Sequence, residues 1–468
     1  MLRNGFFSLV STGVRVLAST VLFIVLAHTW GPEAFGLFMY PFTIAAIVVK
    51  LVDYGFALQL MRDIGHSPTE ARRIMGLAFG AKLLLIVPTA LVAIIVGITL
   101  PHQGPYGVLF ALLLFDALAN SFALFFNTPL RALGRFDTEA YIIAGANVAL
   151  FSVVVTSVAF GAGTVACAVC FVIVRLGYLA AAWTGCSRVL GGRLRPEWTR
   201  EPLLRTLKQG FPFAVHVTVG TLGVHVETIM IQHYMGASAV GLYQAGVRIV
   251  LGALLIADAL NNVYLEALAR TGRDGTGLQK LASRMTRHML VLGVLAFLCT
   301  IGGSAWIVRL LYSNTYDALI PLLPFFGLLM LIRYGGTSYG TLLTLADRQL
   351  VRALAVIGMV VLSVAINAAL IPHFGLSGAI VAAILSHIAL YSVYVVATWR
   401  DHRTLLIDGR SMVLIGVAAV ALSLVLLPVD AGGSIRFQLG VVLVLITTAA
   451  GITRTEWSAL SRRLARVR

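Results

Sequence analysis

The chain has 468 residues, of which 59% are hydrophobic and only 12% are charged, and its mean hydropathy is +0.93. Soluble domains carry about 25% charged residues, so this composition excludes a soluble protein and indicates one embedded in a membrane. The formal net charge is +16. In a soluble chain such a charge would suggest a nucleic-acid partner, but the loops of membrane proteins carry positive charge for orientation. We therefore expect no nucleic-acid partner.

Apolar runs separated by glycine, proline and charged residues predict the spanning helices. A bilayer core about 30 Å thick needs roughly 20 apolar residues per helix. In chain order the predicted spans are 6–29, 36–61, 74–99, 107–130, 139–159, 165–185, 210–234, 240–266, 288–311, 320–344, 352–371, 376–398, 411–428 and 437–453. The expected fold is an all-α polytopic membrane protein with about fourteen transmembrane helices.

The distribution of Lys and Arg predicts the orientation of these helices. With the N-terminus inside, 27 of these residues fall in cytoplasmic segments and one, Arg436, falls outside. Cytoplasmic loops carry an excess of Lys and Arg, so we expect both termini in the cytoplasm and the chain in a bacterial inner membrane. The outside loops are too short to hold a catalytic domain, and we expect a protein that is not an enzyme.

Two stretches of the chain resemble each other at a spacing of 205 residues. The sequence HTWGPEAFGLF at 28–38 aligns with HYMGASAVGLY at 233–243, and the same spacing relates Asp53 to Asp258. The repeat unit holds six helices, and an even number gives both copies the same orientation. The expected parts are an N-terminal lobe, a basic cytoplasmic linker, a C-terminal lobe and two final helices with a basic tail, at 1–185, 186–209, 210–398 and 399–468.

Charged residues inside the predicted spans indicate a functional interior. A charge at the bilayer centre costs about 2.5–3.5 kcal/mol on insertion scales, so these side chains are expected to face the bundle interior or water. The basic set is Arg15, Lys50, Lys82, Arg175, Arg248, Arg309 and Arg333, and the acidic set is Asp53, Asp116, Glu227 and Asp258. A net positive interior suits an anion, and guanidinium groups match phosphate in bidentate geometry. The expected diphosphate-binding residues are Arg15, Arg248, Arg333 and Arg175.

Several of these charges also have a purely structural interpretation. Lys50 and Asp53 are three residues apart and can form a local ion pair. Lys82 and Arg309 lie near span ends, where long side chains extend their charge to the membrane interface. A buried carboxylate can instead bind a coupling proton or ion. The residues expected to act in coupling or in ion pairs are Glu227, Asp53, Lys50, Asp258 and Asp116.

The sequence contains no nucleotide-binding or metal-binding motif. The CxxC spacing of Cys167 and Cys170 lies inside an apolar helix, where small packing residues are the simpler interpretation. We therefore expect no metal, no cofactor and no ATP-driven transport by this chain alone.

Four stretches together resemble a known family. They are GPEAFGLF at 31–38, DYGFALQLMRDIG at 53–65, NTPLRALGRFD at 127–137 and VETIMIQHYMGASAVGLYQAGVRI at 226–249. These are similar to stretches of the bacterial polysaccharide-biosynthesis (Wzx-type) flippases, in which an acid in helix 7 commonly precedes a G…VG.Y..A.R pattern. Glu227 stands here where that family most often has Asp, which leaves its coupling role open.

The resemblance implies a two-lobe, V-shaped bundle of the superfamily that contains MATE multidrug exporters and the peptidoglycan-precursor flippase. It implies outward movement of an undecaprenyl-diphosphate-linked oligosaccharide by alternating access through a cationic central cavity. The product would feed O-antigen, capsule or exopolysaccharide synthesis, with membrane lipids around the protein and a polymerase and chain-length regulator as partners.

Three other functions stay open at this point. The peptidoglycan-precursor flippase shares the helix number and the cationic interior. A MATE-type exporter of cationic drugs would need an acidic or aromatic cavity, against which the basic excess argues. A membrane polymerase or glycosyltransferase usually has a sizeable external loop, which the predicted outside loops do not provide.

Overall fold

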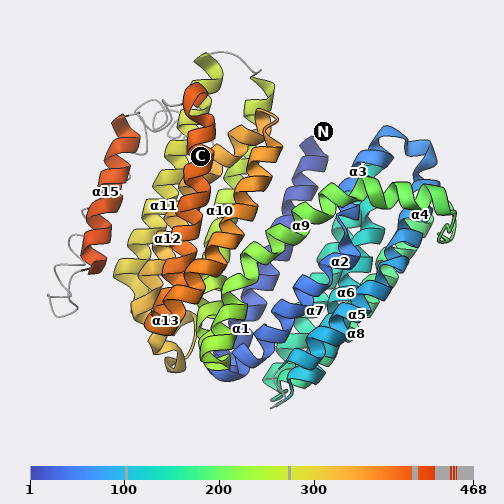
Figure 1. Ribbon diagram of the computed structural model, residues 1–468, viewed down its shortest axis with the longest axis horizontal. Coiled ribbons are helices and arrows are strands. Elements are labelled where there is room, and N and C mark those ends of the chain that lie inside the picture. Colours follow the sequence, from blue (N-terminus) through green and yellow to red (C-terminus); the bar gives the residue numbers. More distant parts are fainter. Residues whose placement is uncertain are drawn as a thin grey trace, which may run out of the picture. The chain divides into compact units, whose positions relative to one another are not determined.

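The structure, a computed structural model, describes residues 2–100, 104–271, 276–402 and 409–426 and a few positions between 443 and 450. Within these residues the chain is helical and contains no strand, as Figure 1 shows. The expected all-helical polytopic fold is thereby confirmed. The chain divides into two compact units, Met1–Ala245 and Gly246–Arg468, which we describe separately.

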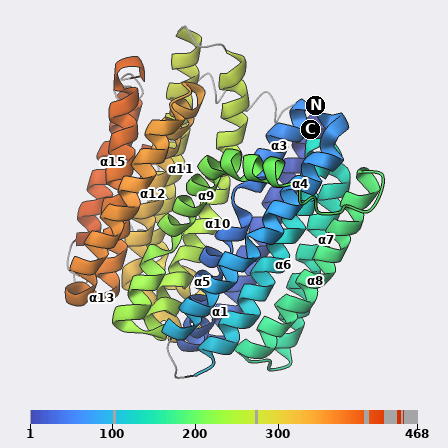
Figure 2. The same cartoon turned by 45° about the vertical axis from the view of Figure 1, so that its right-hand side comes forward.

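The first unit is built mainly from long helices. Their bounds are α1 (Leu2–Val48), α2 (Lys50–Asp53), α3 (Phe56–His66), η1 (Pro68–Glu70), α4 (Ala71–Leu84), α5 (Ile86–Thr99), α6 (Tyr106–Ala132), α7 (Phe136–Ala159), α8 (Thr164–Val189), α9 (Arg200–Met235) and the beginning of α10 (Ala237–Arg270). Helices α6, α7 and α8 pack side by side, and α1 packs against α6 and α7. Figure 2 shows this group from a second side.

The second unit contains the rest of α10 and the remaining described helices. Their bounds are α11 (Thr276–Leu311), η2 (Asn314–Leu322), α12 (Leu323–Leu345), α13 (Gln349–His402) and α15 (Gly409–Leu426). Helix α12 packs against both α11 and α13, and α15 packs on α11. Val294 and Phe297 of α11 form a buried cluster with Val417 and Ala421 of α15.

Ten helical stretches of the described residues are long and apolar enough to cross a membrane. Two of them, Leu17–His66 and Gln349–Trp399, contain 50 and 51 residues. At 1.5 Å per residue each is about 75 Å long, roughly twice what one crossing needs. Each also contains a kink at a glycine with positive φ, Gly31 (φ 76°) and Gly375 (φ 56°). Each stretch therefore accounts for two of the predicted spans.

The last two predicted spans are covered unequally. Helix α15 matches the predicted span 411–428. Most of the predicted span 437–453 lies outside the described residues. The number of fourteen spanning helices therefore stays a prediction, as do the lobe boundaries that rest on the sequence repeat.

The two copies of the repeat share an unusual glycine turn. Gly31 interrupts α1 with φ 76° and ψ 173°, and Gly236 separates α9 from α10 with φ 82° and ψ −171°. These residues are 205 positions apart. The conformation lies in a region that is essentially restricted to glycine, so the shared glycine has a shared structural reason.

Within the first unit, a second pair of glycines brings the repeat copies into backbone contact. A Cβ atom on Gly36 would lie 1.8 Å from the carbonyl oxygen of Ala237, and one on Gly241 would lie 1.8 Å from that of Pro32. The spacing of 205 relates Gly36 to Gly241 and Pro32 to Ala237. The two contacts are therefore equivalent, each made by a glycine of one copy on the first turn of a helix of the other.

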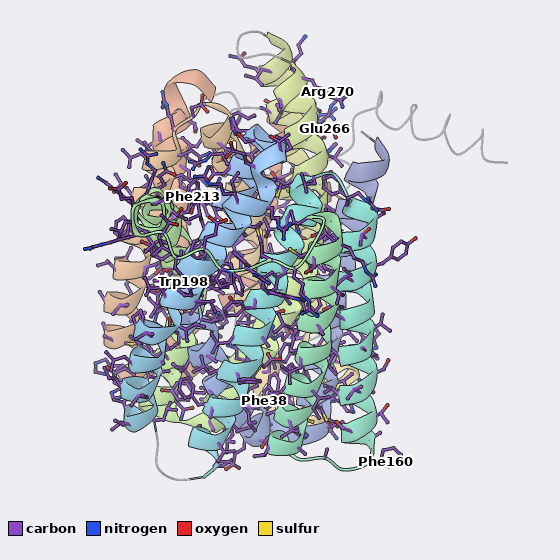
Figure 3. All side chains as sticks on the ribbon, turned by 90° about the vertical axis from the view of Figure 1, so that its right-hand side faces the viewer. Phe38, Phe160, Trp198, Phe213, Glu266 and Arg270 are labelled. Atoms are coloured by element: carbon purple, nitrogen blue, oxygen red, sulfur yellow. The ribbon has the colours of Figure 1, made fainter. Side chains whose placement is uncertain are left out.

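The predicted linker at 186–209 is ordered against α4. The backbone N–H of Glu197 donates to the carbonyl of Gly76 (2.9 Å), and the Arg72 guanidinium donates to the carbonyl of Arg193 (3.1 Å). Gly76 and Gly80 lie one turn apart on α4, and their missing side chains leave room for this backbone. The first turns of α9 then cross α3 and α4, and Trp198 lies exposed just before them (Figure 3).

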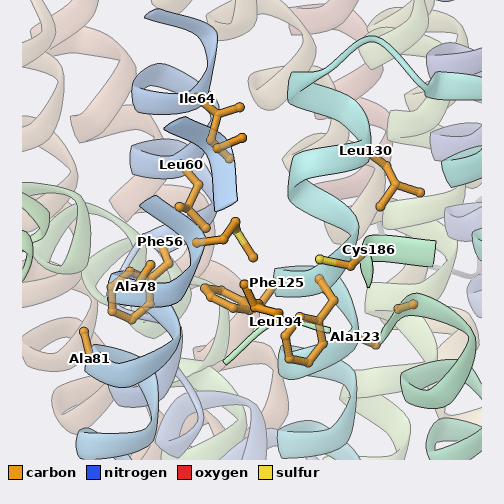
Figure 4. Close-up of a cluster of buried hydrophobic side chains, with 14 of the residues drawn as sticks. Phe56, Leu60, Ile64, Ala78, Ala81, Ala123, Phe125, Leu130, Cys186 and Leu194 are labelled. Carbon is orange, nitrogen blue, oxygen red and sulfur yellow. The ribbon is translucent and has the colours of Figure 1, made fainter. Parts of the chain in front are cut away.

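A buried apolar cluster holds this end of the first unit together. Phe56 and Leu60 of α3, Phe125 of α6, Cys186 of α8 and Leu194 of the linker all belong to it (Figure 4). The side chains come from elements far apart in the sequence, so the cluster fixes the helices that carry the charged residues described next.

Candidate functional site

A charged network occupies the junction of α2, α4 and α6 in the first unit. Asp53 is the last residue of α2, and its two carboxylate oxygens have different partners. Lys50 lies 2.6 Å from Oδ2, so the local ion pair expected from the sequence is confirmed. Lys82 lies 3.4 Å from Oδ1, and the Ser121 hydroxyl donates a hydrogen bond to that same oxygen.

Lys82 is the most enclosed member of this network, with 1% of its side chain exposed. Its ammonium donates to the Ser121 hydroxyl (2.7 Å) and to the carbonyl of Val52 (3.3 Å), and it lies 4.9 Å from the ring centre of Phe122. The expectation that Lys82 extends to the membrane interface is therefore wrong. The oxygens of a helix end and of a serine replace water as partners, which allows the ammonium to stay inside.

The backbone next to Asp53 explains why these oxygens face inward. Tyr54 (φ 46°) and Gly55 (φ 74°) both adopt the left-handed conformation and end α2. A Cβ on Gly55 would lie 2.5 Å from the Cβ of Phe213 on α9, so the close approach of α9 also requires glycine here. The helix interruption leaves carbonyls at the end of α2 without intrahelical partners, and Lys82 takes one of them.

A second buried ion pair joins α6 to α8. The guanidinium Nε of Arg175 lies 3.3 Å from Oδ1 of Asp116, with 16% and 6% of the two side chains exposed. The structure thus brings together one expected phosphate-binding residue and one expected coupling acid. Because Asp116 balances the charge of Arg175, this pair has a ready structural role in holding α6 on α8.

The second unit contains Arg248 and Arg333. Arg333 of α12 interacts electrostatically with Asp258 of α10 and with the hydroxyl of Tyr391 on α13. Asp258 is exposed, whereas Arg333 is half-buried. Arg248 of α10 is half-buried and interacts with Tyr312, which follows α11. Each of the two arginines therefore interacts with a tyrosine that lies outside its own helix.

The remaining expected residues occupy separate positions. Arg15 lies on α1, and its side chain is outside the part that the structure describes. Glu227 is buried on α9 with 4% exposed. Arg309 is exposed at the end of α11 and pairs with Asp317 at 3.2 Å, in keeping with the interface position expected for it.

Two cavities accompany these charges. An apolar one of about 270 Å³ lies among α11, α12, α13 and α15, and Leu290, Gly336, Tyr391 and Leu414 are among its lining residues. A polar one of about 560 Å³ is lined by η1, α4 and the first turns of α9, and Glu70, Arg73, Glu201 and Arg205 are among its lining residues. Among the described residues no group of three or more His, Cys, Asp or Glu side chains is arranged to hold a metal ion.

Sequence reasoning missed three contributors to these sites. Ser121, Tyr312 and Tyr391 are hydroxyl-bearing residues in otherwise apolar helices or at a helix end. Their importance depends on which charge they meet, and such contacts join residues far apart along the chain. The weak signal available was a polar side chain within a long apolar run.

Comparison with known proteins assigns the family. Residues 1–264 match the family described as polysaccharide biosynthesis protein. The chain belongs to this family. The amylovoran biosynthesis protein AmsL of Erwinia amylovora is 29% identical over 165 residues, which cover 34% of this chain and 42% of AmsL. The match thus spans less than half of that relative.

Solved structures show the same fold. The lipid II flippase MurJ in an inward closed conformation superposes with a TM-score of 0.71 at 12% identity, covering 95% of this chain and 98% of MurJ. An inward-facing multidrug resistance MATE transporter of the MOP superfamily superposes with a TM-score of 0.58 at 15% identity, covering 85% and 96%. The chain is therefore a multi-pass membrane protein with the MurJ and MATE fold, and it belongs to a family of polysaccharide biosynthesis proteins.

Proposed function

We propose that this protein moves a polyprenyl-diphosphate-linked oligosaccharide from the inner to the outer leaflet of a bacterial inner membrane. The family supports a role in polysaccharide biosynthesis, and undecaprenyl diphosphate is the carrier we propose. O-antigen, capsule and exopolysaccharide are the candidate products, and a polymerase and a chain-length regulator are the candidate partners. The distribution of basic residues supports the proposal that both termini lie in the cytoplasm.

The charge balance of the helices carries this proposal. Several acids within the predicted spans have basic neighbours, since Asp53 pairs with Lys50 and Lys82, Asp116 pairs with Arg175, and Asp258 interacts electrostatically with Arg333. Within the predicted spans the basic residues exceed the acids by seven to four, and by six to four when Arg309, which lies at an exposed helix end, is left out. An interior of this kind favours a diphosphate over a cation.

Arg248 and Arg333 are the proposed contacts of the diphosphate, together with Arg15. A guanidinium presents a planar fork of donors that fits phosphate oxygens. Asp258 is exposed and interacts with Arg333 only electrostatically, so a diphosphate can compete with this carboxylate for the guanidinium. Arg175 has a lesser part in this proposal because Asp116 holds it between α6 and α8.

A multidrug exporter is the main rival, because MATE transporters share the fold. A cationic drug needs an uncompensated carboxylate or an aromatic cage. Asp53, Asp116 and Asp258 each face a basic side chain, which weakens this alternative. The apolar cavity in the second unit suits a hydrocarbon chain, which the lipid carrier has and a drug need not have.

The test is a transport assay with purified protein in liposomes. It follows the movement of a polyprenyl-diphosphate-linked oligosaccharide between leaflets for the native chain and for Arg248→Ala, Arg333→Ala and Arg15→Ala. We expect a loss of at least tenfold in folded variants, since each removes a phosphate contact. Arg309→Ala is the matched control, because this arginine lies at an exposed helix end and pairs with Asp317.

The outcomes separate the function from the site. Native transport that all three variants retain would contradict the assigned residues while leaving the flippase function in place. A native protein that moves no lipid-linked oligosaccharide but exports organic cations would overturn the function itself.

A further inference from the structure

The ammonium of Lys82 is surrounded by three protein oxygen atoms. A backbone carbonyl (Val52), a carboxylate oxygen (Asp53) and a hydroxyl (Ser121) surround it at 3.3, 3.4 and 2.7 Å. These oxygens come from α2 and α6, while the lysine comes from α4. A carbonyl, a carboxylate and a hydroxyl are the oxygen donors that hard cations take in proteins.

Two of these oxygens lie at the end of a broken helix, and in this the group resembles a cation-binding site more than an ordinary ion pair. Helix α2 ends at Asp53 because Tyr54 and Gly55 turn left-handed, and helix α4 ends at Leu84, two residues beyond Lys82. Where membrane helices are broken, the carbonyls at the C-terminal end of the first half carry partial negative charge and coordinate monovalent cations. Here a lysine side chain occupies that position.

Lys82 and Ser121 share one carboxylate oxygen of Asp53, the Oδ1 atom. Among the described residues, the charged groups acting on Lys82 are Asp53 and Lys50, both on α2. Lys50 contacts Oδ2 of Asp53, whereas Lys82 and Ser121 contact Oδ1. The packed helix α6 adds Ser121 and the rings of Phe122 and Phe125, which lie 4.9 and 5.5 Å from the ammonium and also attract a cation.

We propose that Lys82 is a built-in substitute for a monovalent metal cation. Its ammonium fills a cation site formed by Val52, Asp53 and Ser121, so the native protein needs no Na⁺ or K⁺ there. Shortening Lys82 would open the site, and free Na⁺ or K⁺ would then bind it. The site can be tested without any transport measurement. Only a role of the site in transport would rest on the proposed function.

The test measures the thermal unfolding midpoint of the purified full chain in NaCl, KCl and choline chloride at equal ionic strength. The native midpoint should agree in the three salts to within about 1 °C. For Lys82→Ala we expect NaCl or KCl to raise the midpoint by about 3 °C or more over choline, because a ligand that binds the folded state stabilises it by mass action. Adding Asp53→Asn to Lys82→Ala should abolish this rise.

Two control variants test whether the salt effect is specific to a cation site at Lys82. Lys82→Met fills the same space with an uncharged chain, so its midpoint should not distinguish the salts. Lys280→Ala removes an exposed lysine of α11 and should behave like the native chain. These controls separate a new cation site from a general effect of salt on a less basic protein.

Each contrary result overturns the proposal. A Lys82→Ala midpoint that is equal in all three salts would exclude the cation site. The same holds if Lys82→Ala folds in none of the salts while Lys82→Met folds. A native protein stabilised specifically by Na⁺ or K⁺, with that stabilisation lost in Asp53→Asn, would show that free cations bind beside Lys82. Loss of oligosaccharide transport has no bearing on these readouts.

Discussion

Asp53 and Asp258 occupy equivalent positions in the two copies of the repeat, yet their surroundings differ. Asp53 ends a helix, lies mostly buried and contacts two lysines and a serine. Asp258 lies within the unbroken helix α10, is exposed and interacts with Arg333. The residue equivalent to Gly55 is Leu260, and a leucine does not favour the left-handed turn that ends α2. The enclosed acid, Asp53, is thus followed by a glycine at position 55, whereas the exposed acid, Asp258, is followed by a leucine at the equivalent position 260.

The comparison shows that the two copies both carry an aspartate at this position but surround it differently. In the first unit the broken helix supplies oxygens that enclose a charge. In the second unit the acid lies within a continuous helix and its side chain is exposed. By contrast, the glycines that make contact between the repeat copies, Gly36 and Gly241, have kept equivalent surroundings. Substitutions at these positions test the comparison.

The largest effect on stability is expected at Gly36 and Gly241, where the two repeat copies have equivalent surroundings. Gly36→Ala and Gly241→Ala each place a methyl group 1.8 Å from a backbone oxygen, which no side-chain rotation can relieve. We expect each to lower the free energy of unfolding by about 3 kcal/mol, with nearly equal size. Thermal unfolding in detergent measures this. A clearly unequal pair would contradict the equivalence, and Gly145→Ala, with open space around its Cβ, is the matched control.

The next effect should separate the two acids. Asp53→Asn removes the carboxylate that balances the buried Lys82 and should cost about 3 kcal/mol, since breaking a buried pair leaves a charge uncompensated. Asp258→Asn should cost less than about 1 kcal/mol, because Asp258 is exposed and an exposed charge gains little from an opposite charge. The same unfolding assay compares the two variants. Equal losses would show that burial does not distinguish these acids.

A smaller effect is expected at the glycine that creates the difference. Gly55→Ala introduces strain at φ 74° and a methyl group close to Phe213. We expect a loss of about 2 kcal/mol from the left-handed conformation and the crowding together. Gly65→Ala on α3 is the control, since a Cβ there meets nothing within 4 Å. An unchanged midpoint for Gly55→Ala would argue against the close approach of α9.

The smallest effect should come from Lys50, the more exposed of the two lysines that contact Asp53. Lys50 and Asp53 keep 25% and 23% of their side chains exposed, so Lys50→Gln should cost about 0.5–1 kcal/mol. Lys82→Gln should cost clearly more, because only 1% of the Lys82 side chain is exposed and its polar partners lose a buried contact. The difference in unfolding midpoint between the two variants is the measurement. A larger loss for Lys50→Gln would reverse the assignment of Lys82 as the enclosed partner.

Much of the fold could be predicted from local signals in the sequence. Apolar runs of spanning length gave the membrane class and the helices from 107–130 through 165–185 nearly to their ends. The repeat identified Gly31 and Gly236, which share one backbone conformation. The charged residues within these runs indicated where function lies, because a charge placed in an apolar run needs a partner.

The pairing of those charges could not be predicted from the sequence alone. The Lys50–Asp53 pair was accessible because it lies within one helical turn. The contacts of Lys82 with Asp53 and Ser121 span 29 and 39 residues, and they depend on how α2, α4 and α6 pack. Periodicity and composition say which residues face inward, but only the packed helices decide which of them meet.

The sequence by itself therefore determined that the chain crosses a membrane many times, carries a duplicated glycine turn and keeps more basic than acidic residues inside. These properties follow from hydropathy and backbone conformation, which act locally. The tertiary structure alone decided that Lys82 is enclosed at a broken helix and that Arg175 is balanced by Asp116. It decided this because partners for a charge in a membrane interior come from whichever helix lies alongside.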